Sequence, residues 1–212
     1  MKKLFAILLA AVLALTLNVA ALADITVPGQ SVIVKTEPID YTGKTVILHS
    51  NDVHGAIDGY AYMAALRSDL ESKGAEVIVV DAGDFSQGTT YVSSSKGYAA
   101  VEMMNAAGYD VVTLGNHEID FGYAQLVENL STAEFKTICA DVYLDETGET
   151  MLDPTTVVET ESGLKIGFFG METPETATKV NPGLITEISF ATFGDLYTAA
   201  QTAVDSCPTR IS

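Results

Sequence analysis

Three short segments of the sequence combine residue types that bind divalent cations and act on phosphate. Their candidate ligands are two carboxylates, two imidazoles and one amide, and each segment follows an apolar run. Carboxylate and imidazole side chains presented together are common ligands of divalent metals. Each segment alone is interpretable as a polar loop, but their repetition after three successive strand-like runs predicts a metal centre. The segments are Asp52-Val53-His54, Gly83-Asp84 and Gly115-Asn116-His117-Glu118.

The apolar runs before these segments are typical of β-strands, and apolar residues at helical spacing lie between them. This alternation predicts an α/β layered fold with a mostly parallel sheet. Open sheets of this kind bind ligands at the carboxyl ends of their strands, where the three segments lie. The predicted strands are 45–51, 75–81, 111–114 and 136–140, with a hairpin over 156–159 and 164–170, and the predicted helices are 61–73, 97–107 and 123–130.

The end of the sequence adds a turn-rich acidic stretch and one more helix. Residues 144–154 predict an exposed loop. In the last helix, four apolar residues share one face, and Pro208 would break it. These residues are Phe193, Leu196, Ala200 and Val204.

Spacing within the segments predicts how the side chains point. If the chain stays extended after the first strand, Asp52 and His54 point to the same side. His49 has the opposite parity and should face away from the metals, as a packed or supporting histidine. Asp120, three residues after His117, is predicted to orient that imidazole and to raise its pKa.

The three segments together resemble the calcineurin-like metallophosphoesterases, in particular the exported 5′-nucleotidases and UDP-sugar hydrolases. The resemblance runs from Thr45 to Val204 and implies a layered α-β-β-α sandwich, of which this chain would hold the N-terminal half. The motifs that carry the resemblance are Ile47–Gly55, Asp81–Thr89 and Gly115–Gly122.

The resemblance also implies roles for individual residues. Asp52 and His54 would bind one metal, Asp84 would bridge both and Asn116 would bind the second. A metal-activated hydroxide would attack phosphorus in line. His117, steadied by Asp120, would stabilise the transition state or protonate the leaving oxygen. The implied cofactors are two divalent ions, and the sequence does not distinguish Mn, Zn, Fe, Mg or Ca.

The resemblance is incomplete, because the chain has three histidines, His49, His54 and His117. The family completes its centre with later histidines, so the second metal would keep only Asp84 and Asn116 here. We therefore expect a partial domain over residues 45–205, an atypical tail over 206–212, and a truncated or frame-shifted sequence.

The beginning of the chain predicts export. Lys2 and Lys3 precede an apolar run, and Ala21-Leu22-Ala23 is typical of a cleavage site, so residues 1–23 are interpreted as a signal peptide and 24–44 as an extended leader. The expected location is extracellular, in the cell envelope or periplasmic, without a membrane span after cleavage. The two cysteines are too few for a disulfide scaffold, and Cys139 is predicted to be a buried, inert thiol.

Charge restricts the partners. A formal net charge of −17 disfavours nucleic-acid polymers, whereas a small phosphorylated metabolite such as a nucleotide is compatible with bound cations. Three functions remain open. The chain is a metal-dependent phosphoesterase, a remnant that binds metal or a partner without turnover, or an extracellular interaction module that uses its acidic loop, Asp141–Asp153.

Overall fold

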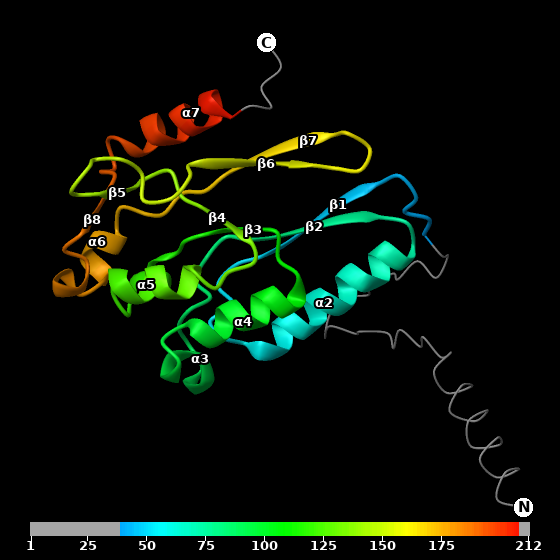
Figure 1. The fold of residues 1–212 in the computed structure, drawn as a ribbon, viewed down its shortest axis with the longest axis horizontal. Helices are drawn as coiled ribbons and strands as arrows, with labels where there is room; N and C mark the ends of the chain where they lie inside the picture. The colour runs from blue at the N-terminus through cyan, green and yellow to red at the C-terminus, as the bar shows by residue number, and fades with distance from the viewer. Residues whose placement is uncertain (1–38, 208–212) are drawn as a thin grey trace, which may run out of the picture. The chain divides into compact units, whose positions relative to one another are not determined.

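The structure is a computed structural model that describes residues 39–207. The predicted signal peptide, most of the leader and the last five residues lie outside the described residues. Four strands form a parallel sheet in the order β1-β2-β3-β4, as the alternating sequence pattern predicts (Figure 1). Their bounds are β1 Thr45–Ser50, β2 Glu76–Asp81, β3 Val111–Thr113 and β4 Lys136–Ile138.

Helices cover one face of this sheet. α2 (Ile57–Ser72) and α4 (Tyr98–Ala107) pack against each other, and α2 also contacts β2 (Figure 1). A short helix, α3 (Thr90–Ser94), precedes α4. The core beneath the helices is built from apolar side chains of the strands and helices that face each other. Its central side chains, each 0 % exposed, include Val79, Val101, Met104 and Val112.

The remaining elements build a second core around α5 (Tyr123–Leu130). β5 (Val142–Leu144) pairs antiparallel with β8 (Ile188–Phe190), and β6 (Thr155–Glu159) forms the predicted hairpin with β7 (Lys165–Phe169). Two short turns, α6 (Thr176–Lys179) and η2 (Pro182–Leu184), precede β8, and α7 (Leu196–Ser206) contacts both strands of the hairpin. The buried residues of this core include Leu114, Ile119, Leu126, Cys139 and Val142. Cys139 is thus buried, as predicted.

The last helix differs in part from the prediction, because it begins at Leu196 and leaves Phe193 outside it. Phe193 is 65 % exposed and Val204 is 40 % exposed, whereas Leu196 and Ala200 are partly buried. The helix is packed through a face of small residues instead, where Ala203 is 2 % exposed. No helix among residues 39–207 is both long and apolar enough to cross a membrane.

His49 lies on the sheet face opposite α2 and α4. It lines a cavity of about 160 Å³ together with Phe168 and Phe169 of β7. The side chain is exposed, so it is not the packed residue that the sequence predicts. This position nevertheless separates it from the other two histidines, which follow the strand ends.

Candidate metal centre

The loops after β1 and β2 continue side by side beyond the sheet. The backbone N–H of Asp52 donates to the carbonyl of Gly83 at 3.0 Å, and that of His54 donates to the carbonyl of Asp84 at 3.0 Å. Gly88 then passes so close to His54 that an added Cβ would lie 2.0 Å from its carbonyl oxygen. The positions of these candidate ligands are therefore fixed by backbone contacts between the two loops.

Three candidate ligands have a left-handed backbone conformation, which residues other than glycine rarely adopt. Asp52, His54 and Asp84 have φ angles of 51°, 48° and 63°. The extended continuation predicted after the first strand is therefore wrong, since the chain turns through left-handed residues at both positions. Such residues cost free energy and concentrate at functional sites. Among the described residues, Lys96 is the one other non-glycine with positive φ.

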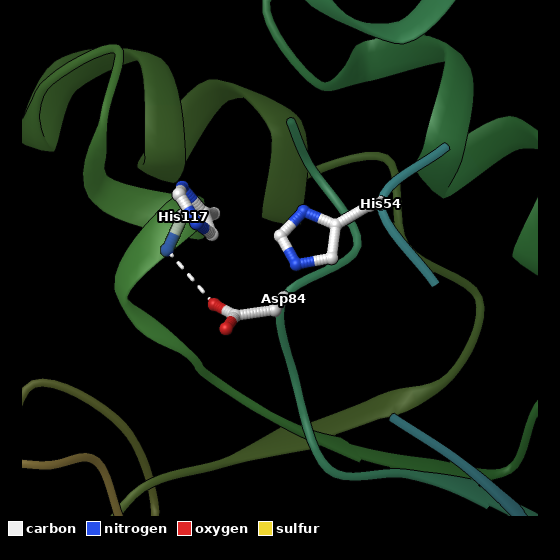
Figure 2. A group of neighbouring side chains, drawn as sticks. All are labelled: His54, Asp84 and His117. Atoms are coloured by element: carbon white, nitrogen blue, oxygen red, sulfur yellow. Dashed lines mark hydrogen bonds between the residues drawn. The ribbon is translucent and has the colours of Figure 1, made fainter. Parts of the chain in front are cut away.

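The structure brings together His54, Asp84 and His117 (Figure 2). One ligand atom of each lies within 4.8 Å of the others, and the two imidazole centroids are 4.8 Å apart. The backbone N–H of His117 donates a hydrogen bond to Oδ1 of Asp84 at 3.0 Å, which the dashed line in Figure 2 marks. Segments more than sixty residues apart in sequence thus meet at one point.

This donor set fits a divalent transition metal. Two imidazole nitrogens and one carboxylate are a common set of protein ligands in catalytic sites, which keep a further position open for water or substrate. The three residues are all partly exposed, so a cation and a small substrate can reach them. The residues present therefore fit at least one cation.

Two predicted ligands lie outside this group of three. The side chain of Asp52 is 61 % exposed, and its Oδ1 is 3.8 Å from Nε2 of His54. Asn116 opens the 3₁₀ turn η1 (Asn116–Ile119) and is partly buried. Their roles as metal ligands stay predictions.

His117 is held in a hydrogen bond with Asp120. The distance between Nδ1 of His117 and Oδ2 of Asp120 is 2.6 Å. Burial opposes protonation of His117, but this hydrogen bond and the charges of Asp120, Asp84 and Glu118 outweigh it and raise the pKa of His117 above 6.5. The contact with Asp120 is thus present, and the role of Asp120 in orienting His117 for the reaction stays a prediction.

Replacing Asp120 by asparagine is expected to lower the pKa of His117, because it removes a negative charge from Nδ1. A raised pKa of His117 stabilises the folded protein at pH values below the pKa of His117 in the unfolded chain. This stabilisation is lost as the pH rises through the pKa of His117 in the folded protein. The variant should therefore lose more stability at about pH 5.5 than at about pH 8.5. NMR titration of the imidazole and denaturant unfolding of metal-free protein measure both effects. An unchanged pKa would contradict the assignment.

One buried carboxylate, Asp81 at the end of β2, escaped the sequence analysis. Asp81 is 3 % exposed, accepts hydrogen bonds from the Ser50 hydroxyl and the Gly83 N–H, and its pKa is raised to about 6, chiefly by burial. The Tyr109 hydroxyl also contacts the Ser50 hydroxyl at 2.7 Å. The sequence signal that could have predicted this buried carboxylate is the position of Asp81 at the end of an apolar strand. Glu118, interpreted from sequence as structural, is 2 % exposed.

A comparison with protein families identifies the chain. Residues 45–179 match the family model described as calcineurin-like phosphoesterase, which is well over half of the chain. This chain belongs to the calcineurin-like phosphoesterase family. The match begins with β1, ends with α6 and includes every residue of the candidate centre.

Curated relatives of this chain include 5′-nucleotidases. The 5′-nucleotidase of Vibrio cholerae is 33 % identical over 162 residues, which cover 71 % of this chain and 29 % of the relative. Protein UshA of Escherichia coli is 30 % identical over the same shares of both chains. The chain thus spans about 29 % of the length of these relatives.

Solved structures agree with the family assignment. The 5′-nucleotidase precursor of Thermus thermophilus superposes with a TM-score of 0.64 at 28 % identity, over 75 % of this chain and 33 % of that one. YfkN of Bacillus subtilis, at 22 % identity and a TM-score of 0.62, shares the fold over 76 % of this chain and 58 % of that one. The α/β phosphoesterase fold predicted from the sequence is confirmed.

Proposed function

We propose that this chain is an exported, metal-dependent hydrolase of phosphoester bonds in small phosphorylated metabolites, nucleotides in particular. The observation that carries the proposal is the meeting of His54, Asp84 and His117 at the carboxyl edge of the sheet. The 5′-nucleotidases among the relatives support nucleotides as the substrate class. The sequence of residues 1–23 supports export.

Divalent cations at this centre would polarise the phosphoryl group and activate water. His54, Asp84 and Asp52 would bind one cation, and Asp84 with Asn116 would bind a second. His117 has its Nδ1 engaged by Asp120, which leaves Nε2 for the substrate. We assign His117 the role of hydrogen-bond donor to a phosphoryl or leaving oxygen, because its Nδ1 is engaged by Asp120 and its raised pKa favours the protonated form.

The chain offers a matched pair of histidines for a test. His54→Ala is expected to lower Mn²⁺ affinity and phosphate release from AMP by about 10- to 100-fold or more, because it removes a ligand. His49→Ala is the control, since His49 is exposed beside Phe168 and Phe169 on a face of the sheet. Calorimetry and a phosphate assay measure the two effects.

Equal losses in both variants would contradict the site. Failure of the wild-type protein to bind Mn²⁺ or Zn²⁺ and to release phosphate would contradict the function. Both outcomes are read on protein first freed of metal with a chelator, so that the added cation is the one that is measured.

A second candidate function is metal binding without turnover. It is favoured by the group of three itself, which offers enough ligands for one cation, and by the chain's total of three histidines. One bound Mn²⁺ per chain without phosphate release would support it, whereas two tightly bound ions with turnover would rule it out.

A further inference from the structure

Glu118 is almost completely buried directly behind the candidate centre, with 2 % of its surface exposed. Each of its two carboxylate oxygens accepts two hydrogen bonds from backbone N–H groups. Oε2 accepts from Asp84 N at 2.8 Å and from Gly115 N at 2.6 Å. Oε1 accepts from Phe85 N at 2.8 Å and from Ser86 N at 2.9 Å. One side chain therefore satisfies four backbone donors.

These four donors belong to two of the three loops that carry candidate ligands, the loops after β2 and β3. Three lie in the loop after β2, which contains Asp84, and the fourth is Gly115, next to Asn116 and His117. The loops touch through their backbones, since a Cβ on Gly83 would lie 2.4 Å from the nitrogen of Gly115. No side chain fits between the two backbones at that contact. Glu118 instead joins the loops by accepting hydrogen bonds from backbone N–H groups of both.

The same carboxylate supports the strained residue of the centre. Asp84 has a φ of 63°, a conformation that persists where surrounding contacts over-determine it. Its backbone N–H donates a hydrogen bond to Glu118, and its Oδ1 accepts a hydrogen bond from the backbone N–H of His117. The direction of the Asp84 carboxylate is thus set from both ends by the turn that contains Glu118.

We infer that Glu118 is a positioning residue that sets the direction of Asp84 and the separation of the two ligand loops, without itself binding metal or substrate. The inference rests on the proposed function for its effect on metal binding. It also makes a claim about the metal-free protein: one carboxylate controls the opening of four amides in two loops.

Glu118→Gln is the informative substitution. The amide group of glutamine has one acceptor oxygen, and its NH₂ would face two N–H donors, so two bonds are lost and two donors are left unsatisfied. We expect at least about 10-fold faster hydrogen exchange at the amides of Asp84, Phe85, Ser86 and Gly115 in metal-free protein. Mn²⁺ affinity should fall by about 10- to 100-fold.

Two comparisons separate positioning from general stability. Glu146→Gln, in an exposed loop, should leave exchange and Mn²⁺ affinity unchanged. In Glu118→Gln the amides of α4 should keep their protection, which a general loss of stability would not allow. Unchanged protection of the four amides together with unchanged Mn²⁺ affinity would overturn the inference.

The wild-type protein provides a test that does not depend on folding of the variant. If one carboxylate holds all four amides, they should share one opening free energy, seen as similar protection with a common dependence on denaturant. Protection that differs widely among the four would overturn the inference. Wild-type protein with this shared opening but no Mn²⁺ binding would refute the proposed function and leave the role of Glu118 standing.

Discussion

Replacing Asp84 by asparagine is expected to lower metal-dependent phosphate release by about 10³-fold or more, because the substitution removes the carboxylate charge at the point where cations would meet the phosphoryl group. Asp84 is the one carboxylate among the three clustered ligands, His54, Asp84 and His117. Asparagine tolerates the left-handed conformation that this position requires. Its amide oxygen can also accept the bond from His117 N. The fold should therefore survive while the chemistry is lost.

Phosphate release from AMP at saturating Mn²⁺, measured with thermal unfolding on the same samples, tests this separation. Asp145→Asn is the control, because Asp145 is an exposed acid in a surface loop and its replacement changes the net charge equally. Activity of Asp84→Asn within about twofold of wild type would place the reaction elsewhere.

Gly83→Ala should destabilise the protein by about 3 to 5 kcal/mol, through strain at positive φ and a steric clash combined. Gly83 has a φ of 96°, and an added Cβ would lie 2.4 Å from Gly115 N and 2.6 Å from the carbonyl carbon of Leu114. Both atoms are backbone at the end of the adjacent strand, so neither can rotate away. The clash would separate the loop after β2 from the loop after β3, which carry candidate ligands. The affinity for metal should therefore decrease together with the stability of the protein.

Gly148→Ala isolates the strain from the clash. Gly148 has a φ of 71° with no atom within 4 Å of its added Cβ, so it should cost only about 1–2 kcal/mol. Denaturant unfolding of metal-free protein compares the two variants. Equal losses of unfolding free energy would show that the close approach at Gly83 carries no cost.

Local sequence signals were sufficient for the parallel sheet. β1 to β4 and the helices between them follow continuous apolar runs and helical periodicity, which depend on neighbouring residues alone. β5 and β8 were missed because their pairing joins Val142–Leu144 to Ile188–Phe190, which lie far apart in the sequence. No short-range pattern records a contact of that separation.

Periodicity predicted the last helix but neither its first residue nor its buried face. Phe193 lies before α7, which begins at Leu196, and Val204 is exposed, whereas Ala203 is buried. A helical pattern states which residues lie together, whereas the surface that covers them is decided by the rest of the fold. The same limit applies to α5, where Leu126 is buried and Val127 is 45 % exposed.

The sequence by itself determined the chemistry available at the strand ends, because a carboxylate, imidazole or amide after an apolar run is a property of the residue and its neighbours. It thereby predicted the family and most of the candidate site, including the pairing of His117 with Asp120, which are three residues apart. The tertiary structure decided which groups meet. The left-handed turns at Asp52 and His54, and three of the four backbone donors that converge on Glu118, involve contacts between loops thirty or more residues apart. Such contacts depend on the path of the whole chain, so no local pattern specifies them.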